Sequence, residues 1–254
     1  MAWTRRYEEA EPQRVNRWLA QAGVCSRREA EGLIARGLVF IDGERVEDAG
    51  RKIAPGQTLV LEEEARAALA GALTVVLHKP VGVVSGQPEP GEVPAVRLLT
   101  RESLRSESAD IPGADRSLAP LGRLDKDSRG LLLLSEDGVV AKAVIGPESG
   151  LDKEYLVRVA GAVDEGKLGR LRHGLRLDGR ALKPAKVMVI SPGRLRFVLS
   201  EGRNRQIRRM CELVGLRVTD LLRVRIGPLR LGELPEGRWR VLTAEERAAL
   251  LRGR

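Results

Sequence analysis

The spacing of apolar residues near the start of the chain predicts two short helices. Apolar side chains in residues 14–22 recur at i, i+3, i+4 and i+7, the pattern of an amphipathic helix, and Gly23 ends it. The segment SRRE predicts a second helix, because Ser26 can cap the amide three residues on while Glu29 reaches back. We expect this helix to end at Gly37. The apolar positions are Val15, Trp18, Leu19 and Ala22 in the first helix and Ala30, Leu33 and Ile34 in the second.

The next segments favour strands. LVFIDGERV combines β-branched and aromatic residues with an Asp42-Gly43 turn, which predicts a hairpin, and PGQTLVL predicts one more short strand. The first sixty residues are therefore interpreted as one compact unit. Residues 62–72, EEEARAALAGA, are charged and rich in alanine without a clear core face, and we interpret them as a linker that can be helical.

From Leu73 onward, strand-like and helical patterns alternate. LTVVLHKPVGVVSG predicts a strand broken by Pro80 and Gly82, and LLLLS at 131–135 predicts a buried strand. Residues 87–117 are rich in proline, serine and acidic residues, which is typical of a mobile surface excursion, with one short helix expected over 96–104. This mixture indicates an α+β domain built on one large sheet.

Charge narrows the function. The chain of 254 residues has a net charge of +9 and a pI near 10.1, carried mostly by arginine, which favours a polyanionic partner such as nucleic acid over an ordinary basic protein. No stretch approaches the length of a membrane span and the first residues lack the apolar segment of a signal peptide, so we expect a cytoplasmic protein. Cys25 and Cys211 stand alone, which argues against a metal site or a disulfide.

The segment LGRLDKDSRGLLLLSEDG holds the strongest candidate for chemistry. Asp125 lies among Arg123, Lys126 and Arg129, just before the buried run of four leucines. An isolated aspartate in such a loop is usually a turn or cap residue. A carboxylate fixed to the core and kept charged by its basic neighbours is also a nucleophile or a base close to a bound polyanion. The residues alone leave both interpretations open.

The wording of residues 14–46, RVNRWLAQAGVCSRREAEGLIARGLVFIDGERV, resembles the S4 RNA-binding module. The resemblance implies that the helix pair meets structured RNA, whereas the alternative is a solvated helical hairpin. The basic residues on the helix pair that we expect to bind RNA are Arg14, Arg17, Arg27, Arg28 and Arg36.

The remaining motifs resemble those of pseudouridine synthases. GRLDKDSRGLLLLSEDG looks like the catalytic motif of that family, and LHKPVGVVS, KEYLV and EGRNRQIRRMCELVG follow the family's other motifs in order. The resemblance points to the rRNA-modifying branch that contains RsuA and its large-subunit relatives RluB, RluE and RluF. It implies a mixed, largely antiparallel sheet with a central RNA-binding cleft, Asp125 as the catalytic residue and Asp127 as a loop residue. We expect an S4 domain at 13–61, a linker at 62–72 and a catalytic domain at 73–254.

Uridine isomerisation explains these residue types. The reaction detaches the base, turns it and rejoins it through carbon, so it needs no cofactor or metal, and we expect none. Asp125 can act as a nucleophile at the ribose anomeric carbon or as a base at the next sugar carbon, and the sequence does not choose. The target uridine must leave its helix. Tyr155, which period-two spacing places on one strand face with Val157 and Val159, is the expected stacking residue and an acceptor for the proton lost at carbon; a core tyrosine is the alternative.

The segment NRQIRRMCELVG predicts a helix capped by Asn204, with Ile207, Met210, Cys211 and Val214 on its apolar face. Arg208 lies at the boundary of that face, and we expect it to form the ion pair that positions Asp125. A solvated basic helix is the alternative. The residues of this domain that we expect to contact RNA are Lys79, which also shapes the cleft wall, Arg123, Lys126, Arg203, Arg205 and Arg209.

The sequence thus predicts an enzyme that converts one uridine of ribosomal RNA, most consistently 23S rRNA, to pseudouridine. Two alternatives stay open: the same reaction on 16S rRNA, and a non-catalytic RNA-binding or ribosome-assembly factor that keeps the fold. We expect a monomer that binds a structured RNA stem-loop and neither a membrane nor a metal.

Overall fold

The computed structural model describes residues 2–105, 112 and 116–253. The chain forms two compact units, which are described in turn. The N-terminal unit runs to Thr74 and includes Ser135–Lys142, and the C-terminal unit contains Val75–Leu134 and Ala143–Arg254.

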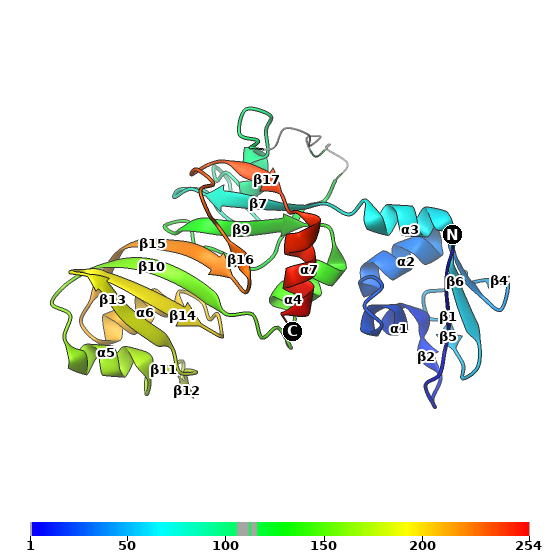
Figure 1. Ribbon diagram of the computed structural model, residues 1–254, viewed down its shortest axis with the longest axis horizontal. Coiled ribbons are helices and arrows are strands. Elements are labelled where there is room, and N and C mark those ends of the chain that lie inside the picture. Colours follow the sequence, from blue (N-terminus) through cyan, green and yellow to red (C-terminus); the bar gives the residue numbers. More distant parts are fainter. Residues whose placement is uncertain (1, 106–111, 113–115, 254) are drawn as a thin grey trace. The chain divides into compact units, whose positions relative to one another are not determined.

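The N-terminal unit contains the predicted helix pair, α1 (Val15–Gln21) and α2 (Arg27–Ala35) (Figure 1). Ser26 Oγ accepts a hydrogen bond from the Glu29 amide at 3.2 Å, and Glu29 Oε2 accepts one from the Ser26 amide at 2.5 Å. The predicted capping box is therefore confirmed. Gly37 follows α2 at φ +73°, a left-handed conformation that glycine adopts without strain.

A four-stranded sheet, in the order β1-β6-β3-β4, completes this unit. The predicted hairpin corresponds to β3 (Val39–Ile41) and β4 (Glu44–Arg45), and the predicted closing strand to β6 (Thr58–Leu61). β1 (Trp3–Arg6), which the sequence did not indicate, pairs antiparallel with β6, and β2 (Gln13–Arg14) pairs with β5 (Lys52–Ile53).

The segment interpreted as a linker contains helix α3 (Glu63–Ala70). Ala65 in this helix is fully buried in the core of the N-terminal unit, and Leu69 packs against the same core. The helix therefore has a narrow buried face. The sequence did not indicate this face, because alanines and charged residues give no clear apolar periodicity.

The C-terminal unit is built on a large sheet whose main path is β13-β14-β10-β15-β9-β7-β17. β10 pairs antiparallel with β14 and β15, β13 with β14, and β17 with β7, whereas β9 runs parallel to β15. The expected mixed, largely antiparallel sheet is confirmed. The strands are β7 (Thr74–Lys79), β9 (Arg129–Ser135), β10 (Lys153–Ala160), β13 (Lys186–Ser191), β14 (Arg194–Leu199), β15 (Arg217–Ile226) and β17 (Trp239–Val241); β8 (Ala119–Pro120) pairs with β9 and β16 (Leu229–Arg230) with β15.

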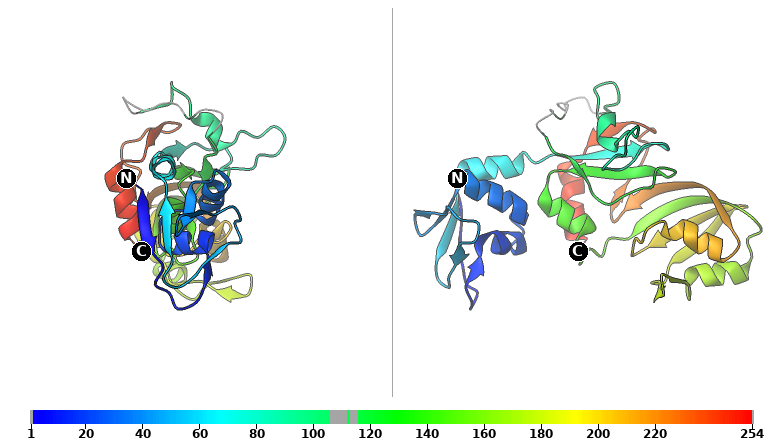
Figure 2. Two further views of the ribbon diagram at one scale, coloured as in Figure 1. Left: turned by 90° about the vertical axis from the view of Figure 1, so that its right-hand side faces the viewer. Right: turned by 180° about the vertical axis from the view of Figure 1, so that it is seen from behind.

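Helices cover parts of this sheet. α6 (Gln206–Leu213) packs against β15 and α5 (Glu165–Arg172) against β13, as the two directions of view in Figure 1 and Figure 2 show. The remaining helices are α4 (Gly138–Ile145) and α7 (Ala244–Arg252), and a small hairpin joins β11 (Arg176–Leu177) to β12 (Arg180–Ala181). Leu131 to Leu134 in β9 are fully buried, which confirms the strand predicted there.

Hydrogen bonds anchor the described part of the 87–117 excursion to the sheet, where the sequence led us to expect a mobile surface segment. The Arg105 amide donates to the Trp239 carbonyl at 2.8 Å, and Trp239 returns hydrogen bonds to Ser103 and Thr100. The expected helix is a single 3₁₀ turn, η1 (Ala95–Leu98). Residues 106–111 and 113–115 of the excursion lie outside the described residues.

Candidate active site

Asp125 lies in the loop between β8 and β9. Its carbonyl accepts the Ser128 amide at 3.0 Å, which closes a turn of four residues. The neighbouring Leu124 is buried, and its amide and carbonyl both bond to Ser85 Oγ, at 2.8 and 2.7 Å. Leu124 therefore fixes the loop to the core directly before Asp125. The Asp125 side chain itself stays 32% exposed.

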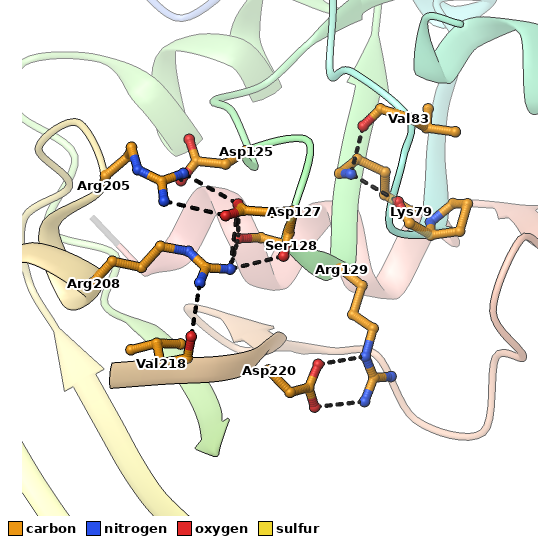
Figure 3. A network of polar contacts seen from close by, with 11 residues as sticks. Lys79, Val83, Asp125, Asp127, Ser128, Arg129, Arg205, Arg208, Val218 and Asp220 are labelled. Carbon is orange, nitrogen blue, oxygen red and sulfur yellow. Dashed lines mark hydrogen bonds and ion pairs between the residues drawn. The ribbon is translucent and has the colours of Figure 1, made fainter. Parts of the chain in front are cut away.

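Arg205 is the cation that contacts Asp125, with Nη1 at 3.4 Å from Oδ2 (Figure 3). The same guanidinium binds both carboxylate oxygens of Asp127, at 3.2 and 3.1 Å. Burial alone favours the neutral form of Asp127. The hydrogen bond from Arg205 and the charges of Arg208 and Arg205 outweigh it and lower the pKa of Asp127.

Arg208 holds the backbone of the loop instead. Its Nη2 donates to the Asp127 carbonyl at 2.7 Å and to Ser128 Oγ at 3.3 Å, and its Nη1 donates to the Val218 carbonyl at 3.4 Å (Figure 3). Arg208 is buried, ties the loop to β15 and also pairs with the Asp127 carboxylate at 3.3 Å, but it forms no ion pair with Asp125. The prediction that Arg208 pairs with Asp125 is therefore wrong, and Arg205 takes that place.

The backbone at the start of α6 explains why Arg205, and not Arg208, contacts Asp125. The predicted cap, Asn204, makes no capping bond; the residue before the helix is Arg205, in a left-handed conformation with φ 48°. A residue with this backbone does not follow the helical wheel, so its side chain reaches the loop rather than the outer face of the helix. The predicted apolar face, Ile207, Met210, Cys211 and Val214, is buried as expected.

A cavity of about 600 Å³ opens beside this loop. Asp125 and Arg205 line it together with Tyr155, which is buried on β10 with Val157 and Val159 as the period-two spacing predicts. Leu199 and Leu221 supply apolar walls. The volume is in the range of small-molecule sites, and the mixture of an aromatic ring, leucines and charges suits a planar polar ring such as a nucleobase.

Lys79 does not face this cavity. It is fully buried and donates hydrogen bonds to the carbonyls of Pro80 and Val83 at 2.8 and 2.6 Å (Figure 3). Burial lowers the pKa of Lys79 to about 8, although the charges of Asp125 and Asp127 act in the opposite direction. The expectation that Lys79 meets phosphate does not fit this placement, because its ammonium group binds two backbone carbonyls and does not line the cavity.

The other predicted RNA-binding residues of this unit differ in whether protein groups already bind their side chains. Arg203 donates to three carbonyls of the β11–β12 hairpin, Arg209 binds Asp178, and Lys126 binds Glu92. The Arg123 side chain is exposed and lies at the cavity. Of these, Arg123 presents its cationic end most openly to a ligand.

The arginines of the N-terminal unit that we expected to bind RNA are exposed in the structure. They are Arg14, Arg17, Arg27, Arg28 and Arg36; other arginines of the unit, such as Arg5 on β1 and Arg45 on β4, are exposed as well. Arg36 forms an ion pair with Glu64 at 2.6 Å, between two exposed side chains, which water screens strongly.

Two basic residues of the cavity were missed from the sequence, Arg223 on β15 and Lys153 on β10. Lys153 precedes Tyr155 by two positions in a strand, so the period-two spacing that singled out Tyr155 could also have found it. Arg223 gave no comparable signal, because it belongs to a strand with several arginines.

Within the described parts of the chain, no cluster of three His, Cys, Asp or Glu residues could hold a metal ion. None of the described helices is long and apolar enough to cross a membrane.

Comparisons with known proteins agree with the geometry. The family model described as RNA pseudouridylate synthase matches residues 73–213, and the S4 domain model matches residues 13–59. The dual-specificity RNA pseudouridine synthase RluF of Escherichia coli is 35% identical over 92% of this chain and 76% of its own length. An uncharacterized RNA pseudouridine synthase of Aquifex aeolicus is 34% identical over 94% of both chains.

A solved structure extends the likeness to three dimensions. The crystal structure of a pseudouridylate synthase superimposes with a TM-score of 0.62 at 27% identity, covering 93% of this chain and 99% of the other. The match covers most of this chain, so sequence and architecture lead to the same assignment. The chain belongs to the RNA pseudouridylate synthase family and carries an S4 domain in front of its catalytic domain.

Proposed function

We propose that this pseudouridine synthase acts on ribosomal RNA, with Asp125 as the catalytic carboxylate. The observation that carries the proposal is that the half-exposed carboxylate of Asp125 and the buried ring of Tyr155 line one cavity of nucleobase size. A carboxylate in such a place can act on the sugar while the ring stacks on the base.

The reaction needs no atoms from outside. The bond between ribose C1′ and uracil N1 breaks, the base turns, and C5 forms the new bond to C1′ while its hydrogen leaves as a proton and N1 takes up a proton. Asp125 acts either as a nucleophile at C1′ or as a base at C2′. Arg205 holds the Asp125 carboxylate, and Arg208 holds the backbone of its loop, so Arg208 is a positioning residue in this proposal.

We assign Tyr155 a second role, through its phenol oxygen. The proton that leaves C5 needs an acceptor inside the cavity, and Tyr155 is a candidate next to the base on which it stacks. This assignment separates the two contributions of Tyr155, since only the phenol oxygen takes part in proton transfer.

The partner we propose is a structured stem-loop of large-subunit rRNA or its precursor. The exposed arginines of the N-terminal unit, the exposed Arg123 and Lys126 and the net charge of +9 support a polyanionic ligand. The wording GVCSRREAE and NRQIRRMCE resembles the large-subunit enzymes. We propose further that the protein works as a monomer in the cytoplasm, where its two buried, unpaired cysteines remain reduced.

Pseudouridine mapping tests this function. Ribosomal RNA from a strain without this gene is compared with RNA from the same strain carrying either the wild-type gene or Asp125→Asn, by primer extension after carbodiimide treatment. We expect one large-subunit site to disappear in the deletion and to return with the wild type alone. Return of the site with Asp125→Asn would exclude Asp125 as the catalytic group, and an unchanged map of both subunits would exclude rRNA as the substrate.

A further inference from the structure

Arg223 is a buried cation in the wall of the cavity, with 2% of its surface exposed. Its Nε donates to the Leu131 carbonyl at 2.8 Å and its Nη1 to the Arg123 carbonyl at 3.5 Å, but its Nη2 has no hydrogen-bond partner. No carboxylate of the described chain forms an ion pair with it, since all its acceptors are backbone carbonyls. The charge of Arg223 is therefore uncompensated.

The neighbouring Arg225 shows what a purely structural arginine looks like in the same strand. It binds both carboxylate oxygens of Asp152, at 2.6 and 3.2 Å, and Glu154 at 2.9 Å. These hydrogen bonds, the one donated to Asp152 first, raise the pKa of Arg225. Arg225 is thus saturated by two acids, whereas Arg223 has none.

A β-bulge gives the two arginines different surroundings. Glu154 of β10 is paired with Arg225, but the next residue, Tyr155, is paired with Arg223, so Val224 is the extra residue on β15. Arg223 consequently lies directly across from Tyr155, and the two side chains share the cavity.

Lys153 adds a second cation to the same place. It lies two positions before Tyr155 and lines the cavity, and its Nζ donates to the Leu151 carbonyl at 3.2 Å. Burial, and after it the charge of Arg223, lowers the pKa of Lys153. The two cations are close enough to repel each other, which makes this end of the cavity strongly attractive to an electron-rich group.

A buried donor without a protein acceptor is costly, and native proteins satisfy it with water, an ion or a ligand. A phosphate is tetrahedral and strongly hydrated, and the exposed Arg123 offers it an open site. The guanidinium of Arg223 is almost fully buried, lines the cavity and lies across from an aromatic ring. A carbonyl oxygen in the plane of a stacked base suits that confined position better than a bulky phosphate does.

We propose that Arg223 binds a carbonyl oxygen of the target uracil, assisted by the charge of Lys153. This inference rests on the proposed function. When the bond between C1′ and N1 breaks, its electron pair stays on the base and is delocalised onto O2 and O4. The cation next to that oxygen stabilises the detached base until C5 bonds to C1′ and the C5 proton leaves, so Arg223 acts more strongly in the transition state than in the bound substrate.

The test combines protein variants with single-atom changes in the RNA. Wild type, Arg223→Met and Arg223→Lys react in single turnover with the stem-loop around the mapped site, carrying uridine, 2-thiouridine or 4-thiouridine at the target. The product is quantified by nucleoside chromatography. Arg230→Met is the matched control, because Arg230 is exposed on β16 and does not line the cavity. Circular dichroism verifies that each variant is folded.

We expect Arg223→Met to slow the uridine reaction roughly 10- to 100-fold, as loss of a hydrogen bond to a charged group does. Sulfur is a weaker acceptor than oxygen, so one thiouridine should slow the wild type about 10-fold. The same thiouridine should have no further effect on Arg223→Met and a reduced effect on Arg223→Lys. The lysine variant still tests the inference if the methionine variant does not fold. Arg230→Met should respond to sulfur as the wild type does.

Equal sulfur effects in wild type and in both Arg223 variants would overturn the inference while leaving the function in place. The same holds if coupling to Arg223 appears only with a methylphosphonate next to the target, which would assign Arg223 to phosphate. Absence of pseudouridine formation by the wild type on any rRNA would remove the proposed function and, with it, this inference.

Discussion

Lys79 provides a quantitative test of the buried charge beneath the active-site loop. Its pKa of about 8 in the folded protein lies about 2.5 below its ordinary value of 10.5. At about 1.4 kcal/mol per pH unit, the folded state is destabilised by about 3.5 kcal/mol when Lys79 is charged in both states. Below pH 8 this cost is fully present. Between pH 8 and 10.5 the unfolded chain binds more protons than the folded one, so the cost disappears and stability rises with pH.

The perturbation is Lys79→Met, which keeps the length of the side chain and removes its titration. We expect the free energy of unfolding of the wild type to gain about 2.5 kcal/mol relative to the variant between pH 7 and pH 10. Other titrating groups are common to both proteins and cancel in this difference. Loss of the bonds to Pro80 and Val83 changes the stability of the variant by an amount that does not depend on pH.

Equilibrium unfolding in urea, followed by tryptophan fluorescence, measures this difference. Trp239 is fully buried on β17, whose residues pair with those of β7, the strand that ends at Lys79. The control is Lys183→Met, because Lys183 is exposed and its charge is hydrated in both states. Parallel pH dependences for wild type and Lys79→Met would refute the reasoning, as would the same change in the control.

Three further outcomes are expected. Arg205→Gln should slow pseudouridine formation roughly 10- to 100-fold, because it removes the charged hydrogen bonds to the two aspartates of the loop. Arg209→Gln removes only an exposed ion pair of the adjacent helix α6 and should change the rate by no more than about 3-fold. Equal effects of the two substitutions would contradict the assignment of Arg205. Tyr155→Leu should slow the reaction roughly 5- to 150-fold, because it removes stacking on the base. Tyr155→Phe keeps the stacking, and it should shift the pH dependence of the rate if the phenol accepts the C5 proton. An unchanged pH dependence would exclude that role. Burial raises the pKa values of Cys25 and Cys211 to about 12, so a thiol reagent at pH 8 should label the native protein slowly and the urea-unfolded protein at once; fast native labelling would contradict their burial.

Features that depend on neighbours in the sequence were predictable. The capping box of Ser26 and Glu29, the turn at Asp42 and Gly43, and the four buried leucines of β9 each follow from a short local pattern. The sequence could not indicate that β1 completes the first sheet, nor that Trp239 anchors the 87–117 excursion. Those partners are distant in sequence, and their pairing depends on the assembled fold.

The candidate site shows the same division. Asp125 and Tyr155 follow from motifs and strand spacing, but the exchange of Arg205 for Arg208 depends on one left-handed residue before α6. Period-two spacing places Arg223 and Arg225 in one environment, and only the bulge at Val224 separates them. Irregular backbone thus decides which arginines serve the cavity, and regular periodicity does not detect it.

The parallel pairing of β9 with β15 has a consequence for the order of synthesis. The Asp125 loop precedes β9, but Arg205, Arg208 and the strand that carries Arg223 are translated about eighty or more residues later. A nascent chain can therefore complete its S4 domain, and even meet RNA through it, while the catalytic loop still lacks every arginine that holds it. Catalytic competence arises late in translation, so binding to RNA and the ability to modify it are separated in time during the life of each molecule.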